Sequence, residues 1–490
     1  MHLLDIITFV IYFVILVFVG MTAAKSTKGF SDFAIAGGKM YWPIVMASMS
    51  ASYIGGGSSI GCAGMAAEMG YAYYGMIGAF ALQMVLVGNY ISPLLKGYNG
   101  AYTVADVMGF HYGRIVRAFT GILSVGVCAG ILGAQIRAIG AITETLLGLP
   151  FLWGAVLGTI LMLIYTIAGG IGSVMRTDTY QFVILGVSVP TAIYFLIRQK
   201  GLSAAKLITT LPDTSFTFLG EVPWTVFVST FIAFLLGETL VPPYASRSFT
   251  AVDSEHARKG VFISGIFGLM WSFVIVSLGV FYSAVHPEVT GDSVLPTLIK
   301  NYLPVAWRGV AFAGLVAVLL STADSYLNST ATSFVQDIWI PFIKPETNDI
   351  QALKLARITT FVAGIVALIF ALRAPSVIEA LIYSYYLWAP TIIIPLVYAV
   401  IKGKASPYSG FSAIVAGTVA TIIWTWVLHE PYGLSGLLIG VISNAVVFFI
   451  AESLTGTKYD YNVRGFIPEH MTSNNITLEK VDITFKATGN

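Results

Sequence analysis

Residues 48–59 read Ser-Met-Ser-Ala-Ser-Tyr-Ile-Gly-Gly-Gly-Ser-Ser and lie inside an apolar stretch long enough to cross a bilayer. Each glycine costs a helix interior about 1 kcal/mol relative to alanine, so three in a row make unwinding easy. The alternative is close helix packing through small residues, but packing motifs usually place glycines four apart. The stretch therefore predicts a transmembrane helix that is unwound near its middle.

The rest of the chain has the composition of a polytopic membrane protein. Of its 490 residues, 57% are hydrophobic and only 10% are charged, whereas a soluble domain carries about 25% charged residues. The apolar runs are continuous and not alternating, which favours helices over a β-barrel. Thirteen membrane-spanning helices are predicted, at residues 4–24, 42–68, 72–95, 118–147, 151–168, 174–197, 223–245, 260–285, 304–334, 356–372, 376–401, 409–429 and 433–452.

The distribution of Lys and Arg predicts the orientation of these helices in the membrane. Basic residues gather in the loops that are cytoplasmic if the N-terminus lies outside. We therefore expect a multi-pass protein of the cell membrane with an outside N-terminus and a cytoplasmic C-terminus. The polar stretch 456–490 is expected to be a cytoplasmic tail.

A second interruption occurs five spans after the first. Residues 237–244 read Gly-Glu-Thr-Leu-Val-Pro-Pro-Tyr, and the adjacent prolines remove two backbone donors. The alternative is a helix that ends at the membrane face, with Glu238 near water. Broken helices at matching positions of inverted halves are typical of secondary transporters, whose sites lie at the membrane midplane. The predicted units are an extra N-terminal span and inner loop (1–41), two inverted repeats (42–197 and 223–401), two C-terminal spans (402–455) and the tail.

The ninth predicted span carries a polar face. Ser321, Ser325 and Asn328 share one side of the helix, with Asp324 beside them. Hydroxyls that bond back to helix carbonyls are the alternative, but they would not account for Asp324. Hard cations prefer oxygen ligands, so carbonyls freed by the first break, facing two hydroxyls of this span, predict an alkali-ion site.

Three motifs resemble a known family. They are Gly169-Gly170 followed by Thr177-Asp178, Arg247 followed by Ala251-Val252-Asp253, and Ser321-Thr322-Ala323-Asp324-Ser325 with Leu327-Asn328. Their residues and spacing resemble the sodium:solute symporter family, which includes proline, pantothenate, sialic acid and glucose carriers, over about residues 1–455. The resemblance implies an all-α polytopic protein of the leucine-transporter type, with a core of five plus five helices in inverted repeats.

The resemblance also implies the ion ligands, with Na+ as the coupling ion. The implied ligands are the carbonyls of Ala51, Ile54 and Val318 and the hydroxyls of Ser321 and Thr322. Some members of the family bind a second cation at positions that match Asp178, Ser321, Asp324 and Ser325. Asp324 stands where those members carry serine, so two facing carboxylates would bind a cation tightly or share a proton. Asp178 could instead help to close an inner gate beside Arg176.

Candidate solute contacts lie beside the two breaks. The predicted residues are Gly56, Ser58, Ser59, Gln135, Arg137, Glu238, Thr239, Tyr244 and Tyr385. Arg137 would suit a carboxylate, unless it pairs with Glu144 or reaches an interface, and Glu238 would suit a cationic amine. Sugar-carrying relatives have amide-rich clusters where this chain has glycine, serine and proline, which favours a small carboxylate or an amino-acid-like solute.

Together these features predict a symporter that imports a small organic solute with sodium by alternating access. A proton-coupled transporter on the same scaffold, a sugar or sialic acid symporter and a sensor that does not transport are the alternatives. The sequence contains no pattern of a nucleophile with its base, so an enzyme is not expected. Without an excess of basic residues, no nucleic-acid partner is expected either. The identity of the solute, the number of sodium ions and the oligomeric state stay open.

Overall fold

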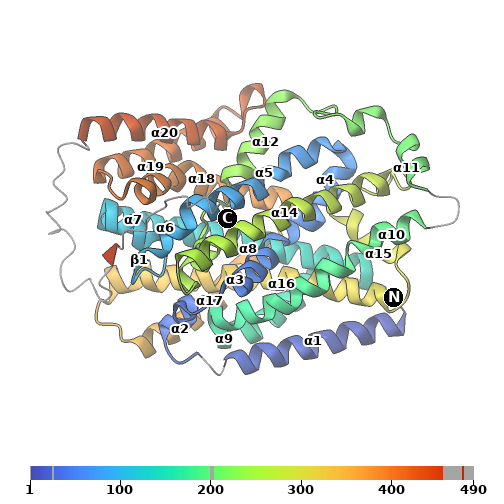
Figure 1. The fold of residues 1–490 in the computed structure, drawn as a ribbon, viewed down its shortest axis with the longest axis horizontal. Helices are drawn as coiled ribbons and strands as arrows, with labels where there is room; N and C mark the ends of the chain where they lie inside the picture. The colour runs from blue at the N-terminus through green and yellow to red at the C-terminus, as the bar shows by residue number, and fades with distance from the viewer. Residues whose placement is uncertain (1, 25–26, 199–202, 456–476, 479–490) are drawn as a thin grey trace, which may run out of the picture.

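The computed structural model describes residues 2–24, 27–198, 203–455 and 477–478. The chain forms a bundle of long helices that run roughly side by side (Figure 1), with the polypeptide crossing the bundle many times. Within the described ranges, 10 helices are long and apolar enough to span a membrane. The all-α polytopic architecture is therefore confirmed.

The helices of the bundle follow one another along the whole chain. They are α1 (Leu3–Ala24), α2 (Phe30–Ile35), α3 (Trp42–Tyr53), α4 (Cys62–Met69), α5 (Ala72–Leu86), α6 (Ser92–Lys96), α7 (Val104–Tyr112), α8 (Arg114–Leu147), α9 (Phe151–Ser188), α10 (Thr191–Ile197), α11 (Ala204–Thr210), α12 (Trp224–Leu236), α13 (Pro242–Thr250), α14 (Ser254–Ser283), α15 (Val294–Tyr302), α16 (Trp307–Ser333), α17 (Asp349–Ala371), α18 (Val377–Lys402), α19 (Pro407–Ile422) and α20 (Gly436–Thr455). The short strands β1 (Tyr98–Asn99) and β2 (Thr477–Leu478) pair in antiparallel fashion.

Both predicted interruptions are present. Helix α3 ends at Tyr53, and a π-helical turn over Gly57–Gly61 leads into α4. Helix α12 ends at Leu236 and α13 begins at Pro242, with proline at the first helical positions, where a missing amide hydrogen costs nothing. Leu240, between them, has a positive φ of 56°. Both apolar stretches therefore contain the non-helical backbone that an ion or solute site requires.

Helix α9 connects two predicted spans, residues 151–168 and 174–197. Its helical path is interrupted at Gly170, where φ is 60° and ψ is −172°. A side chain there would also be too close to α2, because a Cβ would lie 2.7 Å from Phe33 Cα. Glycine therefore allows both the left-handed backbone and the contact. The total of thirteen spans stays a prediction, since three of them are broken or short helices.

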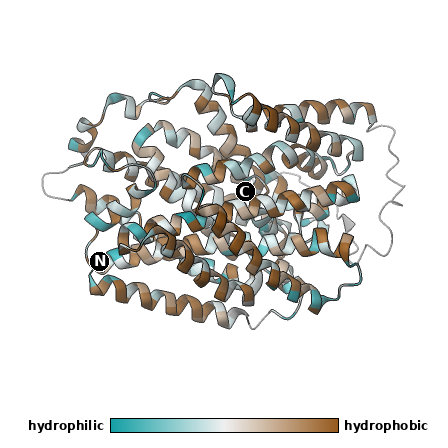
Figure 2. Ribbon diagram, turned by 180° about the vertical axis from the view of Figure 1, so that it is seen from behind, coloured by the Kyte–Doolittle hydropathy of each residue, from teal (hydrophilic) through white to brown (hydrophobic). Residues whose placement is uncertain are grey.

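Helix α16 is the centre of the bundle. In the most apolar 18-residue stretch of the span that contains α16, 94% is buried, whereas the corresponding shares for α1 and α20 are 22% and 28%. It packs against α8, α9, α17, α1, α13 and α3. Figure 2 shows that much of the outer helices is hydrophobic, and many of their large apolar side chains are exposed, as contact with lipid requires. The serine- and threonine-rich stretch of α16 therefore faces protein on every side.

Candidate ion and solute site

The end of α3 meets the polar stretch of α16 at the proposed ion site. The Thr322 hydroxyl lies 3.0 Å from the Val318 carbonyl, 3.5 Å from the Ala51 carbonyl and 3.3 Å from the Ser52 carbonyl. All of these residues are buried. The structure thus brings oxygens of the broken helix and of the central helix close together.

The other predicted sodium ligands make hydrogen bonds that leave them able to bind a cation. The Ser321 hydroxyl donates to Asp178, which uses its hydrogen and leaves its lone pairs available. The Ile54 carbonyl accepts from the Ser59 hydroxyl at 2.6 Å, but a carbonyl oxygen has a second lone pair. The donor set, neutral oxygens with a carboxylate behind one of them, fits an alkali ion.

Gly55 lies between the Thr322 hydroxyl and the side chain of Gln135 on α8. A Cβ at Gly55 would lie 2.8 Å from the Thr322 hydroxyl and 2.9 Å from Gln135 Oε1. Gly55→Ala is therefore expected to displace the Thr322 hydroxyl and to weaken sodium binding several-fold, as measured by equilibrium binding of ²²Na+ to the purified protein.

Gly78→Ala is the matched control for this substitution. Gly78 lies in α5, where a Cβ would meet nothing within 4 Å, so sodium binding should not change. Equal sodium affinity in both variants would mean that the hydroxyl of Thr322 is not an ion ligand.

A buried ion pair lies next to the sodium ligands. Asp178 of α9 accepts hydrogen bonds from Ser48 and Ser321 and lies 3.5 Å from the Arg247 guanidinium. Arg247 Nη2 also donates to Ser52 at 2.9 Å and to Ser325 at 2.5 Å. The guanidinium thus connects α13 to α3, α9 and α16, and both Asp178 and Arg247 are fully buried.

This arrangement bears on the predicted second cation. Asp178 and Ser325 are both bonded to Arg247, so a fixed positive charge already lies between them. Asp324 instead accepts a hydrogen bond from Thr166 of α9. Arg176, beside which Asp178 was expected to help close an inner gate, is exposed. The two residues are two positions apart on the helix and so point in different directions. The partner of Asp178 is Arg247.

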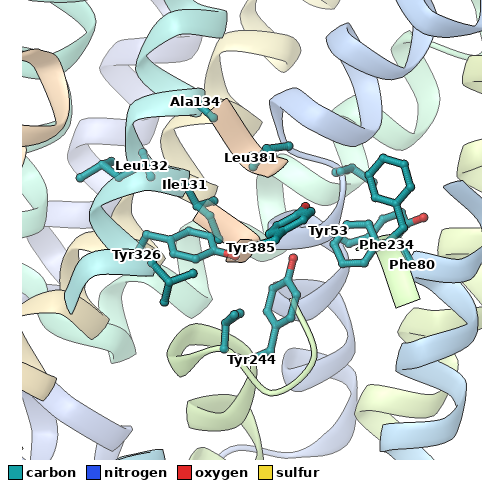
Figure 3. Packing of buried hydrophobic residues seen from close by; sticks show 14 of the residues in the cluster. Tyr53, Phe80, Ile131, Leu132, Ala134, Phe234, Tyr244, Tyr326, Leu381 and Tyr385 are labelled. Atoms are coloured by element: carbon teal, nitrogen blue, oxygen red, sulfur yellow. The ribbon is translucent and has the colours of Figure 1, made fainter. Parts of the chain in front are cut away.

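A small cavity lies between the two breaks. Its lining includes Ser58, Gln135, Glu238, Tyr244 and Tyr385, all predicted as solute contacts, and it reaches the ion site at Gly55 and Thr322. Figure 3 shows Tyr244 and Tyr385 close to one another in this region. Ion site and cavity therefore share a wall.

Three other predicted solute contacts lie near the cavity but are not part of its lining. The Gly56 amide donates to Gln135 Oε1 at 2.7 Å. The Ser59 hydroxyl bonds the Ile54 carbonyl. The Thr239 hydroxyl bonds Gln83, while its carbonyl accepts from Trp388 at 2.8 Å. These residues hold the broken segments in place.

Arg137 lies outside the cavity. Its guanidinium is 3.7 Å from Asp292, packs 5.3 Å from the centre of the Phe151 ring and donates to the Pro375 carbonyl. Burial raises the pKa of Asp292, and the Val377 amide and Arg137 oppose that shift. Asp292 lies far from Arg137 in the sequence, so helical spacing pointed to Glu144, whereas the loop that carries Asp292 supplies the partner.

Several cavity residues were not predicted from the sequence. The rings of Tyr53, Phe80 and Phe234 line the cavity, as do the aliphatic side chains of Ile77, Ile131 and Leu381. Tyr53 could have been found, because it immediately precedes the first break. Phe80 and Phe234 could not, because an apolar residue in a transmembrane helix looks the same whether it faces a cavity, lipid or another helix.

Known proteins resemble this chain in sequence. Residues 33–417 match the model of the sodium:solute symporter family. The sodium/glucose cotransporter of Vibrio parahaemolyticus is 26% identical over 405 residues, which cover 75% of this chain and 74% of that protein. The sodium/myo-inositol cotransporter 2 of Mus musculus is 25% identical, with 86% of this chain and 69% of that protein covered.

Known structures resemble it as well. A sodium-coupled sialic acid symporter in a substrate-bound outward-open state aligns with a TM-score of 0.77 at 17% identity, covering 94% of this chain and 98% of that one. The transporter Mhp1, of the nucleobase-cation-symport-1 family, aligns in a closed conformation with a TM-score of 0.59 at 14% identity, covering 89% and 96%. These likenesses confirm the leucine-transporter-type fold.

Proposed function

Because the chain belongs to the sodium:solute symporter family, we propose that it couples uptake of a small organic solute to one sodium ion bound where α3 breaks against α16. The ligands are the carbonyls of Ala51, Ile54 and Val318 and the hydroxyls of Ser321 and Thr322. The observation that carries this assignment is the position of the Thr322 hydroxyl, within 3.5 Å of oxygens from both helices.

One ion is proposed because Arg247 supplies the second positive charge. Its guanidinium contacts Asp178, Ser52 and Ser325, so the charge of the Asp178 carboxylate is already compensated. A second sodium ion there would face electrostatic repulsion at close range from a buried guanidinium.

The shared wall gives a physical basis for coupling. Gly55 and Thr322 belong both to the ion site and to the cavity lining. An ion that draws α3 toward α16 would fix this wall in the shape that the solute contacts. Solute bound in the cavity would in turn favour the ion, because the coupling free energy, typically about 1–3 kcal/mol, is reciprocal.

The broken helices suggest how access alternates. We propose that residues 42–197 and 223–401 form the inverted repeats, because the first helix of each contains one of the two breaks. Rocking of one bundle against the other would open the cavity to each side in turn. The N-terminus would lie outside and the C-terminus inside, as the positions of Lys and Arg indicate.

Transport in proteoliposomes tests this function. Vesicles loaded with KCl are diluted into NaCl or KCl, and uptake of labelled amines, amino acids, monocarboxylates and glucose is measured. Uptake of a labelled solute should require the inward sodium gradient and survive a protonophore. Uptake that persists without sodium and collapses with the protonophore would contradict sodium coupling and support the proton-coupled alternative.

A further inference from the structure

The cavity contains one charged side chain. Its described lining includes Glu238 but no Lys, Arg or His. Glu238 is 4% exposed and lies in the segment between α12 and α13. Its carboxylate accepts hydrogen bonds from Tyr385 at 2.6 Å and Tyr326 at 2.9 Å. The electrostatic character of the cavity is therefore set by one carboxylate.

Glu238 has no basic partner in the part of the chain that the structure describes. The ion pairs there involve other acidic residues, and the buried Arg247 is bonded to Asp178. Phenol hydroxyls stabilise a carboxylate but do not neutralise it. Because a lone buried charge is costly at membrane depth, a charged Glu238 requires a cation from outside the chain.

Aromatic rings make up much of the remaining wall. Tyr53 and Phe80 lie with ring centres 4.6 Å apart, and Phe80 and Tyr244 are 6.2 Å apart. Phe234 and Tyr385 complete the aromatic part of the lining, and Figure 3 shows these rings grouped around one region. Ring faces attract ammonium groups through their quadrupoles, most strongly where water is excluded.

Three of the neutral polar side chains in the lining already have partners within the protein. The Ser58 hydroxyl donates to the Tyr53 carbonyl, Gln135 Oε1 accepts from the Gly56 amide, and the Thr322 hydroxyl lies against backbone carbonyls. A polyol would need several such groups for its own hydroxyls. A carboxylate would need a basic residue, and Arg137, the candidate for that role, lies with Asp292. Neither solute class matches the lining as well as a cation does.

From this lining we propose that the transported solute carries a cationic nitrogen, an amine or a quaternary ammonium, bound between Glu238 and the rings of Tyr53, Tyr244 and Tyr385. The inference rests on the proposed function and specifies its solute class. An amino-acid-like solute would supply the cationic nitrogen through its ammonium group.

Binding of matched cationic and neutral probes tests the inference. Choline and 3,3-dimethylbutan-1-ol have nearly the same shape, but the second has carbon in place of the charged nitrogen. Binding of choline, ethanolamine, glycine betaine, 3,3-dimethylbutan-1-ol, glucose and propionate is measured on the purified full-length protein by calorimetry in NaCl and in KCl. At least one cationic probe should bind in NaCl, at least tenfold more tightly than any neutral or anionic probe.

Glu238→Gln isolates the role of the charge. Glutamine keeps the size and the hydrogen-bond acceptor, so the variant should lose at least tenfold in affinity for the cationic probe. Glu68→Gln, at an exposed position, is the matched control and should bind like the wild type. Equal affinity in Glu238→Gln, tighter binding of glucose or propionate, or no binding of any cationic probe would each overturn the inference.

A measurement of sodium binding distinguishes failure of this inference from failure of the proposed function. Equilibrium binding of ²²Na+ to Glu238→Gln should match that of the wild type, which also shows that the variant is folded. Loss of ²²Na+ binding in a variant that keeps the wild-type melting temperature would make Glu238 an ion ligand and overturn the inference. If the wild type itself binds no ²²Na+, the proposed sodium site is wrong. The preference for cationic over neutral and anionic probes still tests the solute class in that case.

Discussion

Replacing Arg247 with methionine is expected to lower the free energy of unfolding by about 3–5 kcal/mol, the usual cost of leaving a buried charge without its partner. Arg247 is fully buried and bonds to Asp178, Ser52 and Ser325, which lie on three other helices. Methionine fills similar volume but leaves Asp178 uncompensated. The loss should be visible as a large drop in melting temperature of the purified protein.

The double variant Arg247→Met/Asp178→Asn distinguishes the lost charge from lost packing. It removes both charges and should recover part of the stability. Arg258→Met is the control, because Arg258 forms an exposed pair with Glu255 on the surface of α14, and such pairs contribute about 0–1 kcal/mol. A double variant no more stable than Arg247→Met would show that the ion pair is not what holds these helices together.

Thr322→Ala is expected to weaken sodium binding at least tenfold. The substitution removes the oxygen that lies within 3.5 Å of carbonyls from both α3 and α16. No lost charge and only a small change in volume accompany it, so the protein should still fold. The measurement is a ²²Na+ saturation curve on the purified protein, with the melting temperature recorded in KCl.

Thr360→Ala provides the control for this variant. Thr360 is a buried threonine of α17 whose hydroxyl bonds to the Ala356 carbonyl at 2.8 Å. Its removal should leave the ²²Na+ curve unchanged. If both threonine variants bind sodium like the wild type, the ion lies somewhere other than beside Thr322.

The fold was predictable because backbone hydrogen bonds within a bilayer can be satisfied only in helices or closed barrels. Apolar runs of about 20 residues must be helices, and the interruptions at residues 55–57 and 242–243 are visible as glycine and proline runs. In the structure the first helix breaks after Tyr53, at the start of the glycine run, and the second break covers residues 237–241, directly before the prolines. The predicted separation between residues 151–168 and 174–197 coincides with Gly170, where the helical path of α9 is interrupted.

The site was predictable only in part. The proposed sodium ligands come from a resemblance to family motifs, and the Thr322 hydroxyl lies 3.5 Å from the carbonyl of Ala51. The partners of Arg137 and Asp178 depend on contacts between distant segments, with Asp292 and Arg247 respectively. No helical periodicity encodes such pairs. The aromatic lining of the cavity could not be predicted for a similar reason. Nothing in the local sequence of Phe80 or Phe234 distinguishes a ring that lines a cavity from one packed in the core.

Hydrogen–deuterium exchange of the wild type in NaCl and in KCl tests the central claim most directly. If sodium joins the broken end of α3 to α16, peptides that contain residues 51–59 and 318–325 should exchange more slowly in NaCl, and Thr322→Ala should abolish the difference. Sodium-dependent protection confined to other helices, or protection that persists in Thr322→Ala, would contradict the assignment of the ion to this junction.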